Sequence, residues 1–268
     1  MRPRGALLVL VLLLLPAFAH AAEPPALVRA RTLYNAADYD GAIAAAAVAQ
    51  RLPAAADAAS LVLARAHLER YRRNTVESDL VAAREALAGV RRALLTPRDQ
   101  VDLLVGLGQS LFFGELFGAS AELFDTALSS GAVLPPRDRL LLLDWWASAL
   151  DREAQTRQAD RRAPLFERIV ERMEGELRDD PGSAPANYWL AVATRGAGDL
   201  DRAWDAAVAG WVRSNLSPAS AAALRADLDR LVTQAIIAER ARTRPPREQQ
   251  DAVAALRAEW DLVKQQWK

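Results

Sequence analysis

The chain has no cysteine and only two histidines among its 268 residues. Without cysteine it can form neither a disulfide bond nor a thiolate metal site, and a lipid anchor on an N-terminal cysteine is excluded as well. His20 lies in an N-terminal segment with the pattern of a leader, which leaves His67 as the one histidine of the mature chain. A lone histidine on a predicted helix favours packing over a role as ligand or base. We therefore predict no metal site and no cofactor.

An excess of either charge is also missing. The 34 basic residues balance the 34 acidic ones, and removal of Arg2 and Arg4 with the leader leaves a formal charge near minus two. Binding to a phosphate backbone needs concentrated basic charge, and no Gly-rich phosphate loop is present either. No nucleophile stands beside a base in any recognisable motif. The composition predicts no nucleic-acid partner and no enzyme activity.

Strict alternation of apolar and polar residues is absent over any window long enough for a half-buried strand. From Leu27 onward apolar residues recur instead at spacings of three and four, among many Ala, Leu, Arg and Glu residues. Thr96-Pro97 and Ser217-Pro218 each offer an N-cap followed by a proline in the first turn. The pattern predicts an all-α protein with helices of moderate length and short loops.

The first 21 residues differ from the rest. Arg2 and Arg4 precede an apolar run, and the run ends at the small-residue site Ala19-His20-Ala21. This order is typical of a secretory signal peptide cut after Ala21. An uncleaved membrane anchor is the alternative, although the apolar core is short for a bilayer. We expect the mature chain to be periplasmic or secreted, with no stable membrane span after cleavage.

One pattern is written twice, as ADYDGAIAAA at residues 37–46 and as GDLDRAWDAA at residues 198–207. In both copies a small residue and an aspartate mark a tight turn, and apolar residues at helical spacing follow. The buried positions that this spacing predicts are Tyr39, Ala42, Ile43, Ala46 and Ala49 in the first copy, and Leu200, Ala203, Trp204, Ala207 and Gly210 in the second.

A third stretch, LLVGLGQSLFFGELFGASAELFDTAL at residues 103–128, has small and large residues in the same order. Together these stretches resemble tetratricopeptide repeats, whose helix-turn-helix unit has about 34 residues. The small-residue position of the first helix falls at Ala30, Ala64, Gly108, Trp146 and Ala191 in five successive units. A tryptophan in that position makes the fourth unit the poorest match, and the registers of the second and fourth units stay open.

The resemblance implies a right-handed α-α superhelix, a solenoid of about five helix pairs over residues 22–216. Residues 217–268 no longer repeat, and we expect two helices that cap the open end of the array. The last helix has a narrow apolar stripe formed by Val253, Leu256, Trp260, Val263 and Trp267. The stripe is expected to pack on the array; a dimer seam is the alternative, so monomer and dimer both stay open.

In arrays of this kind the first helices line a concave surface that binds partners. Carried over to this chain, that surface consists of Arg31, Tyr34, Arg65, Glu69, Gln109, Phe112, Phe113, Asp144, Tyr188 and Trp189. Its mixture of Arg, acid, amide and aromatic groups suits a protein or peptide, while packing between units is the alternative reading of the aromatic residues. The expected function is a noncatalytic binding scaffold of the bacterial cell envelope. The alternative is a periplasmic small-molecule binding subunit that accompanies a transporter.

Overall fold

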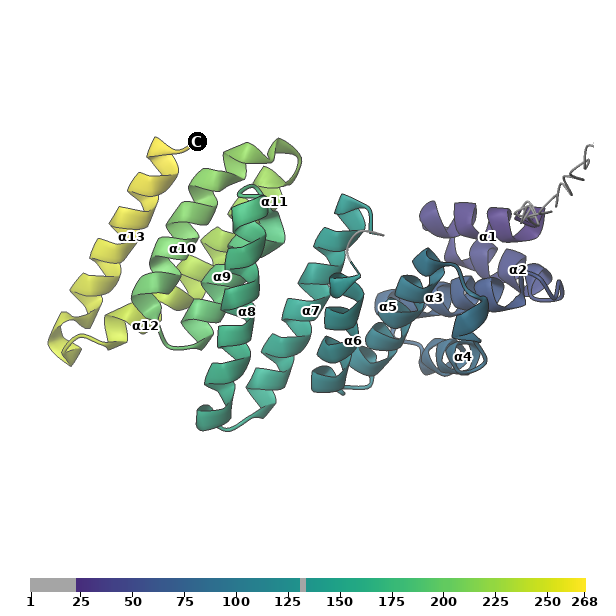
Figure 1. The fold of residues 1–268 in the computed structure, drawn as a ribbon. Coiled ribbons are helices and arrows are strands. Elements are labelled where there is room, and N and C mark those ends of the chain that lie inside the picture. Colours follow the sequence, from purple (N-terminus) through teal and green to yellow (C-terminus); the bar gives the residue numbers. More distant parts are fainter. Residues whose placement is uncertain (1–22, 131–133) are drawn as a thin grey trace, which may run out of the picture.

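The computed structural model describes residues 23–130 and 134–268, and within these ranges the chain is all-helical, without a strand. The all-α class predicted from apolar spacing is therefore confirmed. The predicted signal peptide, residues 1–21, lies outside the described residues. Figure 1 shows the helices following one another in a row, with the N-terminal helices at one end and the C-terminal helices at the other.

The first ten helices form five successive pairs. The pairs are α1 (Pro25–Asn35) with α2 (Tyr39–Ala49), α3 (Ala56–Asn74) with α4 (Glu77–Ala88), α5 (Pro97–Phe113) with α6 (Phe117–Ser129), α7 (Pro136–Thr156) with α8 (Ala159–Asp179), and α9 (Ala184–Gly196) with α10 (Leu200–Arg213). The chain ends with α11 (Pro218–Leu231), a π-helical turn (Val232–Ile236), α12 (Ile237–Arg242) and α13 (Gln249–Gln266). Short 3-10 turns lie at Arg92–Leu94, Ser214–Leu216 and Pro246–Glu248.

Helices pack in the order of the sequence. Each of the ten paired helices contacts the one that follows it, and α10 contacts α11. Odd-numbered helices also contact the next odd-numbered helix, from α1 to α3 to α5 and from α7 to α9 to α11. An ion pair of 2.5 Å between Arg98 Nη2 and Asp138 Oδ2 joins α5 to α7. The first helices of successive pairs are thus neighbours along one side of the row.

The repeated sequence pattern forms the same turn at both of its sites. Ala37 and Gly198 have φ angles of 59° and 89°, in the left-handed region that allows an abrupt reversal after a helix. Asp38 and Asp199 then cap the following helix, because each side chain accepts a backbone N–H three residues later at 3.0 Å.

The third copy of the turn has a different cap. Glu115 has a φ of 60°, but Leu116 occupies the N-cap position of α6 and has no side-chain oxygen to offer. Glu153 of α7 replaces it, because its Oε2 accepts the N–H of Gly118 at 3.0 Å. The missing local cap is therefore supplied by the next helix pair.

The two predicted proline-led helix starts differ in detail. The Thr96 hydroxyl accepts the N–H of Asp99 at 3.1 Å, so the expected cap is confirmed. Ser217 precedes α11, but its side chain makes no capping hydrogen bond, and that part of the prediction is wrong. The fixed φ of Pro218 in the first helical turn starts this helix without help from the hydroxyl.

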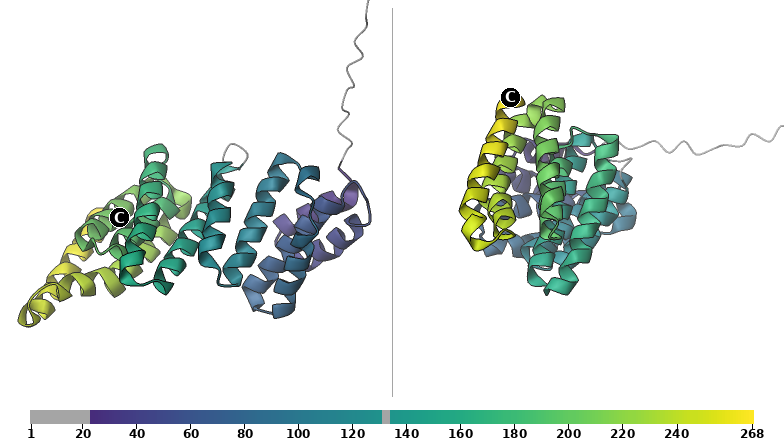
Figure 2. Two further views of the ribbon diagram at one scale, coloured as in Figure 1. Left: turned by 60° about the horizontal axis from the view of Figure 1, so that its bottom comes forward. Right: turned by 90° about the vertical axis from the view of Figure 1, so that its left-hand side faces the viewer.

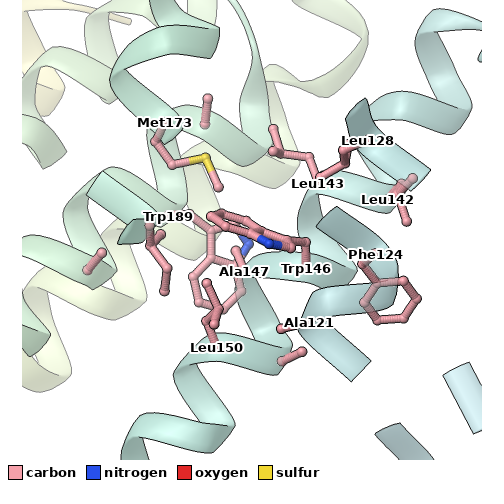
Figure 3. Close-up of a cluster of buried hydrophobic side chains, with 14 of the residues drawn as sticks. Ala121, Phe124, Leu128, Leu142, Leu143, Trp146, Ala147, Leu150, Met173 and Trp189 are labelled. Atoms are coloured by element: carbon pink, nitrogen blue, oxygen red, sulfur yellow. The ribbon is translucent and has the colours of Figure 1, made fainter. Parts of the chain in front are cut away.

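The interior changes in composition along the row. Around α1 to α3 it consists mainly of alanines together with Leu27 and Val62. The largest cluster, from α5 to α9, surrounds the fully buried Trp146, which lies among Leu143, Met173 and Trp189 (Figure 3). Tyr39 and Ile43 are only half-buried, since α2 lies near the end of the row and has fewer neighbours.

The last helix, α13, covers the far end of the row (Figure 2). Trp260 is fully buried, with ring centroids 6.0 Å from Trp204 and 5.4 Å from Trp211. Its indole N–H donates to Asp229 Oδ1 at 2.8 Å. The centre of the apolar stripe thus packs on the chain itself, while Trp267 remains 48% exposed.

Candidate binding groove

A groove of about 780 Å³ lies between α1, α3, α5 and α7, near the N-terminal end of the row. Its lining residues are Arg31, Tyr34, Asn35, Ala37, Tyr39, Leu61, Val62, Arg65, Glu69, Arg72, Arg98, Asp99, Asp102, Arg137, Asp138, Leu141, Asp144 and Trp145. Most are charged or aromatic. It collects side chains from four successive odd-numbered helices.

Helical spacing places these side chains on a common side. On α3, Arg65, Glu69 and Arg72 lie at intervals of four and three residues, so they share one face. On α5, Arg98 and Asp102 are four residues apart and face the same way. The groove is therefore built from stripes on rigid helices, and no loop is needed to form its floor.

Arg31 joins the first helix to the third pair. Its Nη2 contacts Asp99 Oδ1 at 2.9 Å and Oδ2 at 3.0 Å, and its Nε lies 3.1 Å from Glu23. Asp99 is 3% exposed and also accepts the Thr96 hydroxyl at 2.9 Å. A buried carboxylate with a charged partner and a further donor is well satisfied, so this contact fixes α1 against α5.

A second series of ion pairs crosses the floor. Arg65 of α3 contacts Asp102 of α5 at 3.0 Å, and Arg98 contacts Asp102 at 3.5 Å. Arg98 continues the series to Asp138 of α7. Burial alone would lower the pKa of Arg65, but Tyr34 and Asp102 outweigh it and raise that pKa. The guanidinium stays charged, and the series holds three helices in a fixed spacing.

Aromatic rings form the N-terminal wall. The Arg65 guanidinium carbon lies 4.8 Å from the centroid of the Tyr34 ring, a cation-π contact. Tyr34 also packs against Tyr39, with centroids 5.7 Å apart. Burial raises the pKa of Tyr34 above its usual value, so its hydroxyl is neutral and can donate a hydrogen bond to an occupant of the groove.

The opposite wall has an acid with no basic partner among the described residues. Asp144 Oδ1 accepts the indole N–H of Trp189 at 2.8 Å. Burial raises the pKa of Asp144, the Trp189 hydrogen bond opposes that shift, and Asp227 adds to it. Since the indole is neutral, the carboxylate keeps an uncompensated negative charge whenever it is ionised.

The ten residues predicted for partner binding fall into three sets. Arg31, Tyr34, Arg65, Glu69 and Asp144 line the groove. The other five do not: Phe112, Phe113, Gln109, Tyr188 and Trp189 lie beyond it. Phe112 and Phe113 are half-buried and reach its edge through Trp145, at centroid distances of 5.1 and 5.8 Å.

The remaining three side chains pack against the protein interior. Gln109 and Trp189 are buried at 5% and 7% exposure, and Tyr188 is half-buried against Trp189 with centroids 5.4 Å apart. Burial raises the pKa of Tyr188, and Asp227 adds to the shift. Of these three, Trp189 supports the wall from behind, because its indole N–H positions Asp144.

Sequence reasoning missed several lining residues, among them Arg98, Asp102, Arg137 and Leu141. They lie in the first turns of α5 and α7, upstream of the stretches that match the repeat. A helical count finds the two on α7, because steps of three and seven back from Asp144 reach Leu141 and Arg137. Trp145 is half-buried at the groove as well.

His67 lies apart from the groove. Its Nδ1 is 2.7 Å from Asp79 Oδ1, which joins α3 to α4, and Arg70 approaches the same carboxylate at 3.3 Å. Over residues 23–130 and 134–268, no three His, Asp or Glu side chains gather in a way that could hold a metal ion. Within those ranges no helix combines the length and the apolar character that crossing a membrane requires.

Comparison with known proteins adds no further identification: no family model, curated protein or solved structure matches this chain.

Proposed function

We propose that this chain is a noncatalytic binding scaffold of the bacterial cell envelope, which holds a protein or peptide partner in the groove. In this proposal residues 22–216 form a right-handed superhelix of five tetratricopeptide-like pairs, and residues 217–268 cap it. Sequence-order packing and the contacts between odd-numbered helices support that arrangement. The three copies of one turn, at Ala37, Glu115 and Gly198, support it as well.

The observation that carries the functional proposal is the groove itself. Four odd-numbered helices and Tyr39 of α2 supply its lining, and ion pairs between the odd-numbered helices hold their spacing before any partner arrives. A preformed surface loses less conformational freedom on binding, so more of the contact energy appears as affinity. Its residue types, Arg with Tyr and Trp, are those enriched at the centres of protein interfaces.

A periplasmic small-molecule binding subunit is the second candidate. The volume of about 780 Å³ lies within the range of small-molecule pockets, and Tyr34 and Trp145 offer aromatic surface to an organic ligand. A peptide scaffold fits better because most of the lining is charged and internally paired. Pockets for small ligands are mostly apolar, with few polar groups.

Site-specific photocrosslinking tests the proposal. The photoreactive residue p-benzoylphenylalanine is placed at Leu141, which is 55% exposed within the groove. The matched control carries it at Val81 of α4, which is 45% exposed and lies outside the groove. After irradiation of intact cells, we expect a discrete protein adduct at position 141 and none at position 81.

Equal labelling at both positions, or no adduct at position 141, would contradict the scaffold proposal. Mass spectrometry of the purified mature protein separates the second candidate. A metabolite that co-purifies with the wild type and is lost on Tyr34→Ala substitution would establish small-molecule binding in its place.

A further inference from the structure

Most charges that line the groove are cancelled within the protein. Four arginines pair with four carboxylates: Arg31 with Asp99, Arg65 with Asp102, Arg98 with Asp138, and Arg72 with Glu69. The distances between the paired atoms run from 2.5 to 3.0 Å. These eight residues present no net charge to an occupant, so they set the shape of the groove more than its electrostatic preference.

Two charged lining residues remain, and both belong to α7. No ion pair joins Arg137 or Asp144 to any residue that the structure describes. Arg137 is exposed, and Asp144 has only the neutral indole N–H of Trp189 as a donor within the described chain. With respect to those residues, the groove therefore presents one unpaired positive charge and one unpaired negative charge.

The geometry of α7 fixes the separation of these charges. Seven residues at 1.5 Å each put Arg137 and Asp144 about 10 Å apart along the helix axis. Seven residues are close to two full turns, so both side chains leave the helix on nearly the same side. Leu141 lies between them and is 55% exposed, and Trp145 is half-buried beside Asp144. We call these four residues the α7 strip.

An exposed leucine between two unpaired opposite charges is complementary to a ligand with the matching order of groups. Such a ligand has an acidic group, then an apolar group, then a basic group, over about 10 Å. A polyproline II segment supplies this spacing, because its rise of about 3.1 Å puts residues three apart about 9 Å from each other on the same side. An extended segment of this length also fits within the groove volume.

We infer that the groove binds an extended peptide segment that has an acidic and a basic side chain three residues apart, with an apolar residue between them. The acid pairs with Arg137, the base pairs with Asp144, and the apolar residue covers Leu141. This inference rests on the proposed binding of a protein or peptide and names the chemistry of that partner.

Synthetic peptides test the spacing. Each is acetylated and amidated so that its termini carry no charge, and its proline-rich backbone holds the polyproline II form. The probe peptide has Glu and Lys three residues apart around a leucine. The controls have Glu at both positions, Lys at both positions, or Glu and Lys adjacent. Fluorescence anisotropy with the mature protein should show the probe binding about fivefold tighter than any control, the ratio that one partly screened ion pair supplies.

Charge reversal on the protein makes the test specific. Arg137→Glu should transfer the preference to the Lys/Lys peptide, and Asp144→Lys should transfer it to the Glu/Glu peptide. Because Asp144 also accepts the Trp189 N–H, Asp144→Asn serves as a second variant that retains an acceptor and should lose the preference without unfolding. Arg257→Glu on the exposed side of α13 is the control and should leave the preference unchanged.

Each other outcome overturns the inference. If peptides bind without regard to charge spacing, or if the reversed variants keep the wild-type preference, the strip does not select the partner, although the scaffold proposal survives. If no peptide binds while the crosslinker at Leu141 captures a protein, only the partner chemistry is wrong. If both experiments give nothing, the scaffold proposal fails too.

Discussion

The two halves of the row are built from different side chains. All seven tryptophans lie at or after Trp145, so α1 to α6 contain none. In the first half the interior consists of small and aliphatic side chains. Alanines such as Ala30 let neighbouring helices approach closely around α1 to α3, and leucines dominate around α3 and α4. In the second half Trp146 and Trp204 supply the bulk instead. The same pairing of helices is thus reached by close approach in one half and by aromatic filling in the other.

The polar contacts differ in the same way. In the first half, guanidinium groups bind carboxylates between helices, as Arg31 does with Asp99. In the second half such pairs continue, as between Arg195 and Glu239, and indole N–H groups are added to them, as Trp189 does with Asp144. A guanidinium cancels the charge of the carboxylate that it holds, whereas an indole positions the carboxylate and leaves its charge in place. Asp144 is held by an indole and not by a guanidinium, which explains why the groove has a positioned but uncompensated acid.

The largest effect on stability is expected when a tryptophan of the second half is truncated. Trp146→Ala should lower the free energy of unfolding by about 3–5 kcal/mol, because a fully buried tryptophan leaves a large cavity among rigid neighbours. Chemical denaturation followed by circular dichroism measures the change. Figure 3 shows Leu143, Met173 and Trp189 near the ring.

Two controls sharpen this prediction. Trp267→Ala makes the same chemical change at a 48% exposed position and should cost no more than about 1 kcal/mol. Trp146→Phe should cost much less than alanine, since the indole N–H of Trp146 has no hydrogen-bond partner among the described residues. Equal losses for Trp146→Ala and Trp267→Ala would show that aromatic filling does not stabilise the second half.

Close approach in the first half is tested by adding one methyl group. A Cβ on Gly108 would lie 2.5 Å from the ring of Phe124, which is fully buried and cannot move aside. Gly108→Ala should therefore destabilise the protein by about 1–3 kcal/mol through overpacking, despite the better helix propensity of alanine.

Gly175→Ala provides the matched substitution in the second half. Gly175 lies inside α8, and the nearest atom to a methyl group added there would be the flexible end of Arg178 at 3.6 Å. Helix propensity then dominates, and this variant should be stabilised by about 0.5–1 kcal/mol. Thermal melting shows whether each variant is less or more stable than the wild type. A stabilised Gly108→Ala variant would mean that α5 and α6 do not depend on close approach.

Much of the helical organisation could be predicted from the sequence because its signals are local. The turn at Ala37 and Gly198 needs only a left-handed residue and an aspartate, and both are visible in the sequence. Thr96 likewise caps α5 through neighbours in the chain. Ser217 shows the limit of this reasoning, because a residue suited to capping does not have to make the bond.

The site was only partly predictable, because its contacts join residues far apart in the chain. Nothing local indicates that Arg31 meets Asp99, or that Trp189 supports Asp144 from the next helix pair. The predicted face also treated each repeat separately, so it could not distinguish Asp144 at the groove from Gln109 in the interior. Which charged side chains neutralise one another depends on the spacing between helices, and that spacing cannot be predicted from the sequence.

The smallest effect concerns acid stability in the tryptophan-rich half. Burial favours the neutral form of Asp229, but the hydrogen bonds from Lys264 and Trp260 outweigh it and lower its pKa. A lowered folded-state pKa contributes stability above the unfolded value of about 3.9, and that contribution is lost as the pH falls through the folded value. Asp229→Asn should cost roughly 1 kcal/mol or less at neutral pH, since the carboxylate is partly exposed and screened.

The difference between wild type and Asp229→Asn should therefore be smaller at about pH 2.5 than at neutral pH, because the contribution of the carboxylate is lost as the pH falls toward its folded-state pKa. Urea unfolding at the two pH values measures it, with Asp205→Asn on the exposed side of α10 as a control that should match the wild type at both. A difference that persists in acid would mean that Asp229 acts through its shape and its hydrogen bond to Trp260 alone. The indole would then hold a carboxylate whose charge contributes nothing, unlike the paired carboxylates of the first half.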